Sequence, residues 1–134
     1  METKEKNSLL IVDDDTSNLM ELIHILQPEY KIYAAKDGLS ALRTAKNALP
    51  DLILLDIIMP DMNGFSVLAE LKKVDSTKSI PIIFMTGLDD ENKENEGLAL
   101  GAVDYILKPF SAETVKLRIA QQIKIIDLQR KLET

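Results

Sequence analysis

The sequence predicts an α/β fold in which helices cover both faces of a parallel β-sheet. Short apolar segments alternate with longer amphipathic ones along the whole chain, a pattern typical of strand and helix pairs. Breakers such as Pro28, Gly38 and Gly64 fall between these segments. The segment Asp51–Asp56 is apolar at every interior position, as expected of a central strand buried on both faces.

Five strand and helix pairs can be assigned in this way. The strands are expected at Ser8–Asp13, Tyr30–Ala34, Asp51–Asp56, Ile80–Met85 and Val103–Leu107. The helices are expected at Thr16–Gln27, Leu39–Ala48, Phe65–Lys73, Asp90–Leu100 and from Ala112 onward. The second and fifth strands mix polar with apolar residues, so they suit the edges of the sheet.

Length and composition indicate one globular domain of 134 residues, with 46% hydrophobic and 28% charged residues. We expect its core to span about residues 8–126. No apolar stretch reaches the ~18 to 20 residues of a membrane span, and the polar start Met1–Asn7 has no signal core. A cytoplasmic location is therefore expected, with no membrane contact. The absence of cysteine excludes disulfides and thiolate zinc sites. The net charge of −6 repels phosphate backbones, so direct nucleic-acid binding is not expected.

Carboxylates follow two of the predicted strands. Asp13 and Asp14 come after one apolar run and Asp56 closes another. Ligands of open parallel sheets bind beyond the carboxyl ends of the strands, and converging carboxylates raise one another's pKa values unless a cation joins them. Magnesium prefers such oxygen ligands, so we expect Asp13, Asp14 and Asp56 to bind Mg²⁺. Taken alone, however, Asp14, Asp15 and Thr16 are equally compatible with simple capping of the next helix.

Two further strand ends carry groups suited to a phosphoryl group. Thr86 follows the apolar run that ends at Met85, and Lys108 follows the run that ends at Leu107. A hydroxyl can donate a hydrogen bond to a phosphoryl oxygen, and an ammonium can balance its charge. Either residue is unremarkable singly, but the coincidence at matching strand ends favours a phosphoryl site.

Four segments, taken together, resemble a known family. They are Leu10–Asp15, Asp56–Gly64, Thr86-Gly87 and Gly101–Phe110. Their order, spacing and strand placement resemble the response-regulator receiver domain of two-component signalling, in particular its chemotaxis-regulator type, from about Ser8 to Ile126. The resemblance implies a flavodoxin-like (βα)5 three-layer sandwich whose five-stranded parallel sheet has the order 2-1-3-4-5.

The resemblance also implies a role for each candidate site residue. Asp56 would be the phosphoacceptor, and Lys108 and Thr86 would contact the phosphoryl group. The magnesium ligands would be Asp13, Asp14, Asp56 and the backbone carbonyl of Ile58. Tyr105 would be the aromatic residue whose rotamer follows Thr86, although a half-buried aromatic on an edge strand is the commoner fate of such a residue. The Lys108-Pro109 bond is a candidate cis peptide on the same ground.

On this interpretation the protein is a signalling switch whose chemistry is limited to its own phosphorylation and dephosphorylation. A sensor histidine kinase or a histidine phosphotransfer protein would donate the phosphoryl group. The altered surface would be formed by the fourth helix, fifth strand and fifth helix. It would meet a downstream output domain or protein, or a second copy of the chain.

Two other functions remain open from the residues. A small phosphohydrolase of the haloacid-dehalogenase type would use a signature Asp-x-Asp-x-Thr, which Asp13–Ser17 nearly matches, but the chain is short and lacks a cap domain. A metal-free interaction module is disfavoured because every expected chemical group is present.

Two further predictions concern the lifetime of the phosphorylated form and the role of the last helix. Ile58 and Leu88 flank the expected path of a hydrolytic water and offer it no polar group, which predicts a long-lived acyl phosphate. Gly87 would leave the pocket more open and opposes that effect.

In the last helix an apolar set that includes Val115 and Ile126 is spaced to pack on strands. The apolar residues near the end lie on another face, which suits a second copy or an output domain.

Overall fold

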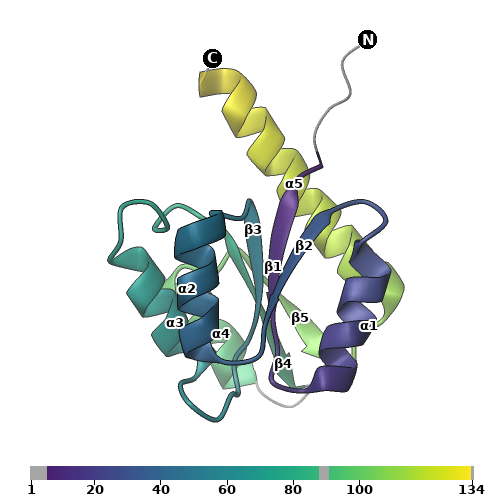
Figure 1. The fold of residues 1–134 in the computed structure, drawn as a ribbon, viewed down its shortest axis with the longest axis vertical. Coiled ribbons are helices and arrows are strands. Elements are labelled where there is room, and N and C mark those ends of the chain that lie inside the picture. Colours follow the sequence, from purple (N-terminus) through teal and green to yellow (C-terminus); the bar gives the residue numbers. More distant parts are fainter. Residues whose placement is uncertain (1–5, 88–90, 134) are drawn as a thin grey trace.

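A parallel β-sheet runs through the molecule with helices on both faces (Figure 1). The computed structural model describes residues 6–87 and 91–133. The strands are β1 Ser8–Val12, β2 Lys31–Ala35, β3 Leu52–Asp56, β4 Ile82–Gly87 and β5 Asp104–Lys108. The helices are α1 Thr16–Leu26, α2 Gly38–Ala48, α3 Gly64–Lys72, α4 Glu91–Leu100 and α5 Ala112–Glu133. Every predicted element forms close to its expected bounds; Asp90, the expected start of the fourth helix, lies outside the described residues.

The strand order β2-β1-β3-β4-β5 confirms the flavodoxin-like sheet. All four neighbouring pairs are parallel, and the register places Asp56 beside Met85 and Thr86 beside Leu107. β3 is central and buried at every residue, while β2 and β5 form the edges, as the sequence predicted. The carboxyl ends of all five strands therefore meet at one edge of the sheet.

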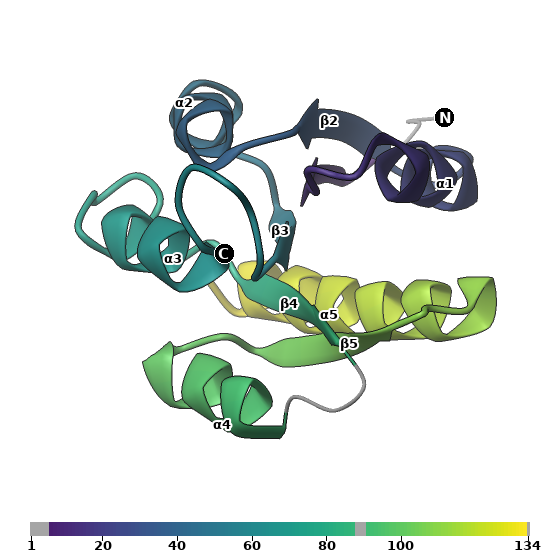
Figure 2. The ribbon, with the colours of Figure 1, turned by 90° about the horizontal axis from the view of Figure 1, so that it is seen from below.

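The helices lie on both sides of the sheet (Figure 2). Two apolar cores fill the spaces between the sheet and these helices. One core joins the sheet to α1 and α5 and includes Ile11, Leu54 and Ile106. The other joins it mainly to α2 and α3 and includes Val12 and Leu55. Because side chains alternate along a strand, this division fixes the face toward which each strand-end residue points.

Helix α4 is held against the sheet mainly by close backbone approach. Among its described side chains, at residues 92–100, only Gly97 is buried. A Cβ atom at Gly97 would lie 2.7 Å from the ring of Phe84, closer than carbon atoms can approach. Phe84 in turn packs edge-on against Phe65 of α3. The absence of a side chain at position 97 therefore sets the distance between α4 and the sheet.

Helix α5 packs through one face and continues past the end of the sheet (Figure 1). The buried set is the predicted one, with Val115 and Ile126 among its members, while Leu128 and Leu132 are 50% and 87% exposed. Arg130 forms an ion pair with Asp51, which also accepts a hydrogen bond from the Ser8 amide at 2.8 Å. None of the helices in the described part of the chain has the length and apolar character that a bilayer crossing requires.

Candidate functional site

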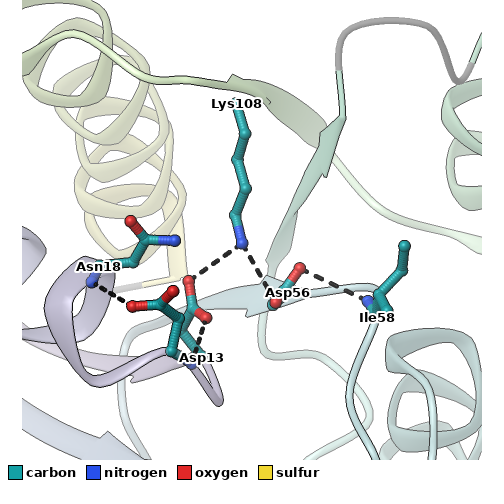
Figure 3. Close-up of polar contacts among 6 residues, drawn as sticks. Asp13, Asn18, Asp56, Ile58 and Lys108 are labelled. Carbon is teal, nitrogen blue, oxygen red and sulfur yellow. Dashed lines mark hydrogen bonds and ion pairs between the residues drawn. The ribbon is translucent and has the colours of Figure 1, made fainter.

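Three of the predicted site residues meet at the carboxyl edge of the sheet. Asp13 follows β1, Asp56 ends β3 and Lys108 ends β5. The Nζ atom of Lys108 lies 3.2 Å from Oδ2 of Asp13 and 3.1 Å from Oδ2 of Asp56. Figure 3 shows the lysine side chain reaching between the two carboxylates. Strand alternation directs all three side chains to the face covered by α1 and α5.

Both carboxylates are shielded from water. Asp13 is 0% exposed and Asp56 is 5% exposed. Backbone amides orient them: Asp15 donates to Oδ1 of Asp13 at 3.0 Å, and Ile58 donates to Oδ1 of Asp56 over a long 3.4 Å. The charge on Oδ2 of Asp13 is balanced by the Lys108 ammonium, whose Nζ atom lies 3.2 Å away.

This burial and crowding change the pKa values of the reactive groups. Burial, opposed by Lys108 and reinforced by repulsion from Asp13, raises the pKa of Asp56 from 3.8 to about 6. Burial alone would lower the pKa of Lys108, but its attraction to Asp56 and Asp13 outweighs burial and raises that pKa. At neutral pH Asp56 is therefore mainly ionised and Lys108 is charged.

The acids form a set that suits a hard divalent cation. One carboxylate oxygen from each of Asp13, Asp14 and Asp56 can be chosen so that all lie within 4.8 Å of one another. Carboxylate oxygens with room for water on one side are what Mg²⁺ prefers, and Asp14 is exposed at the rim while Asp13 and Asp56 are buried. The donor set therefore fits magnesium.

The sequence also allowed Asp14, Asp15 and Thr16 simply to cap the next helix, and this applies to Asp15. Asp15 is the N-cap of α1, and its carboxylate accepts a hydrogen bond from the Asn18 amide at 3.1 Å. Asp13 and Asp14 take no part in that cap. The capping residue and the candidate metal ligands are therefore neighbours in sequence with separate tasks.

Thr86 and Tyr105 share, by strand alternation, the face of β4 and β5 on which Phe84 lies. Thr86 has the parity of Phe84, so its side chain is directed to the face that α4 covers. It is 4% exposed, and its hydroxyl has no hydrogen-bond partner within the described residues. Tyr105 pairs in register with Phe84, is half-buried and therefore shares that face. An unsatisfied buried hydroxyl is rare and calls for a partner.

Comparison with known proteins identifies the family to which these features belong. Residues 9–120 match the response regulator receiver domain family. The chain belongs to this family. The receiver domain of this chain has the acidic pocket, the strand-end lysine and the sheet order that the resemblance implied.

Individual relatives carry different names and match the chain over only part of their own length. The chain is 40% identical to a probable cyclic di-GMP phosphodiesterase of Vibrio cholerae over 89% of its own length and 27% of the relative's. It is 41% identical to the probable transcriptional regulator ycf27 of Guillardia theta over 89% of its own length and 45% of the relative's. The chain thus spans less than half of either relative.

A solved structure matches the receiver domain more completely. The chemotaxis response regulator CheY4 of Vibrio cholerae superposes with a TM-score of 0.82 at 33% identity. The match covers 87% of this chain and 98% of that structure. Against the phosphohydrolase alternative, Asp15, the second acid of that signature, is used as a helix cap.

One residue near the receiver pocket was not predicted from the sequence. Asp61, in the loop between β3 and α3, accepts hydrogen bonds from the amides of Gly38 at 3.0 Å and Leu39 at 3.2 Å. The hydrogen bond from Gly38 is the largest influence that lowers the pKa of Asp61. These amides begin α2, more than twenty positions earlier in the chain, so no local pattern around Asp61 could have indicated the contact.

Two of the residues expected to govern hydrolysis, Ile58 and Gly87, are described, and both lie at or just beyond the carboxyl ends of their strands. The Ile58 side chain is 63% exposed, and a Cβ atom at Gly87 would meet nothing within 4 Å. Leu88, the other predicted flank, lies outside the described residues. The Lys108-Pro109 peptide is cis, as the resemblance suggested.

Proposed function

We propose that this receiver domain is a phosphorylation switch in which Asp56 accepts a phosphoryl group from a phosphohistidine. The observation that carries the proposal is the convergence of Asp56, Asp13 and Lys108 within one buried cluster at the carboxyl edge of the sheet. The family match supports the same role. The proposed magnesium ligands are Asp13, Asp14, Asp56 and the backbone carbonyl of Ile58.

The transfer needs an ionised carboxylate beside fixed positive charge. An oxygen of Asp56 attacks phosphorus, an O–P bond forms, and the P–N bond breaks with its electron pair leaving on the histidine nitrogen. A pKa of about 6 leaves Asp56 mainly deprotonated at neutral pH while keeping it basic enough to act as a nucleophile. Lys108 would pair with the transferred oxygens, and bound magnesium would supply further positive charge to them.

The modified state would be read through Thr86. Its buried hydroxyl lacks a partner, and a phosphoryl group on Asp56 offers a charged acceptor that exists only after modification. Tyr105 shares the face of Thr86, so a shift of the threonine changes the space beside the ring. Such a differential contact shifts the population of the α4-β5-α5 surface between two states.

This surface is where we place the partners of the phosphorylated form. A sensor histidine kinase or a histidine phosphotransfer protein would act as donor at the acidic pocket. An output domain or protein would recognise α4-β5-α5, or two copies would pair there. Residues 1–134 would form a single receiver domain in the cytoplasm, with the exposed end of α5 directed toward a partner.

Phosphorylation with acetyl phosphate and magnesium, followed by intact mass, tests the proposal. We expect one phosphoryl group on the parent protein and none on Asp56→Asn. Asp75→Asn is a matched control because its side chain is 98% exposed and far from the cluster in sequence. Absence of the adduct from the parent would contradict the proposal, and sustained turnover of a phosphate ester would revive the phosphohydrolase. Sedimentation with and without beryllofluoride tests the pairing of two copies.

A further inference from the structure

The loop between β3 and α3 carries Ile58 and is held at both ends. Ile57 is 2% exposed, and its carbonyl accepts a hydrogen bond from the Gly64 amide at 2.7 Å. Met59 is 8% exposed and belongs to the core on the α2 and α3 side. After Met59 the loop passes the start of α2, where its own Asp61 accepts hydrogen bonds from the Gly38 and Leu39 amides.

Asp61 joins the loop to α2 through both of its carboxylate oxygens. Oδ1 accepts from the Gly38 amide and Oδ2 from the Leu39 amide. The first amides of a helix have no partner within the helix, and an anion there is further favoured by the helix dipole. The N-cap Asp37 satisfies a different amide of the same turn, that of Ser40, at 2.7 Å. Two acids therefore share one helix end, one local and one from the loop.

A second contact ties the same two segments together. Met62 packs on Gly38 so closely that a Cβ atom at position 38 would lie 2.1 Å from its Cγ. The close approach requires a residue without a side chain at the start of α2. Asp61 and Met62, adjacent in the loop, thus bind the same turn by charge and by packing.

We propose that Asp61 is a positioning residue for magnesium binding, since its two hydrogen bonds to α2 fix the loop whose Ile58 carbonyl would be a ligand. This inference depends on the proposed function, in which Ile58 supplies that carbonyl. Asp61 touches neither the metal nor the phosphoryl group in this role. Its effect would pass through the three peptide units of residues 58–61, which join the hydrogen-bonded carboxylate to the Ile58 carbonyl.

Asp61→Ala and Asp37→Ala separate positioning from helix capping. Each variant removes one carboxylate from the start of α2, so each loses a similar share of charge and of capping, but only the first releases the loop. Magnesium affinity is measured by calorimetry on the unphosphorylated protein, and hydrogen exchange of residues 57–64 is followed without metal. We expect ~10-fold weaker magnesium binding and faster loop exchange in Asp61→Ala, a loss typical of groups that orient metal ligands. Asp37→Ala should keep the parent affinity.

Three further measurements test the positioning role of Asp61. Asp61→Asn keeps one acceptor oxygen without the charge, so partial recovery of affinity supports positioning, and free energies of unfolding show that the variants are folded. Equal affinities in Asp61→Ala and the parent, or equal losses in Asp61→Ala and Asp37→Ala, would overturn the role of Asp61 alone. A parent protein that binds no magnesium would overturn the proposed function as well.

Discussion

The Nζ atom of Lys108 lies 3.1 Å from Oδ2 of Asp56. The two residues end strands that are separated by β4, so the contact spans the carboxyl edge of the sheet. Before phosphorylation this ammonium offsets the repulsion between Asp56 and Asp13. In the proposed reaction the same ammonium would pair with the incoming phosphoryl oxygens. It already lies beside Asp56, so it would not have to move there.

Substitution of Lys108 should change both the pKa of Asp56 and the rate of phosphorylation. Lys108→Met removes the attraction that holds down the pKa of Asp56, so that pKa should rise above about 6. Phosphorylation by acetyl phosphate should slow by about 100-fold, as for loss of one charged contact to a transition state. Intact mass against time gives the rate, and Lys116→Met, an exposed change on α5, should leave it unaltered. A rate equal to the parent's would contradict the role of Lys108.

Stability should depend on the ionisation of Asp56. Its pKa in the folded protein is about 6, above the ordinary 3.8, so the folded state binds the proton more tightly than the unfolded chain. Its contribution to stability is therefore present below about pH 4 and is lost as the pH rises through about 6. Without divalent ions, Asp56→Asn should be more stable than the parent by roughly 2 to 3 kcal/mol above about pH 7, and this gain should vanish toward pH 4.

Urea unfolding at several pH values measures that difference. Asp75→Asn serves as the reference, because Asp75 is exposed and forms only a surface ion pair with Lys78, a class of contact worth little. A difference between Asp56→Asn and the parent that stays constant with pH would show that burial of the charge is not its cause.

The unpartnered hydroxyl of Thr86 leads to a third prediction. Thr86→Val keeps the shape and removes the buried hydroxyl, so the unphosphorylated protein should gain about 1 kcal/mol. Thr77→Val should instead lose about 1 kcal/mol, because the Thr77 hydroxyl donates to the Leu71 carbonyl at 2.7 Å. Beryllofluoride with magnesium should stabilise the parent more than Thr86→Val. Equal stabilisation of the two proteins would count against a phosphoryl contact by Thr86.

The lifetime of the phosphorylated form should depend on Ile58. Its exposed apolar side chain gives a hydrolytic water no group for orientation, whereas the amide of Ile58→Asn or the carboxylate of Leu88→Glu would provide one. Both variants should lose phosphate faster than the parent. Decay of the adduct by intact mass after removal of acetyl phosphate tests this, and identical decay in all three proteins would exclude it.

Much of the site could be predicted because parallel strands bring their carboxyl ends to one edge. Apolar runs gave the strands, so the residue after each run had to lie near the others, and Asp13, Asp56 and Lys108 do meet. The burial of β3 and the edge positions of β2 and β5 followed from the same patterns. Local periodicity was enough for these features because each depends on one strand and its end.

Other features depend on contacts that sequence patterns do not record. A cap and a metal ligand are both acids before a helix, so the separate task of Asp15 became clear only from its hydrogen bond to Asn18. The contact of Asp61 with α2 joins segments far apart in the chain. The Thr86 hydroxyl lacks a hydrogen-bond partner because of how the residues around it pack. The residue type alone does not predict which polar atoms will lack one.

Of the described residues 92–100 of helix α4, only Gly97 is buried. This has an evolutionary consequence. A residue without a side chain meets the sheet, so the exposed described positions of the helix, such as Asn92 and Leu98, bear little of the folding energy. Mutations there can accumulate with small effects on stability. Duplicated copies of such a domain can therefore acquire new recognition specificities on α4 while the reactive pocket and the fold stay intact.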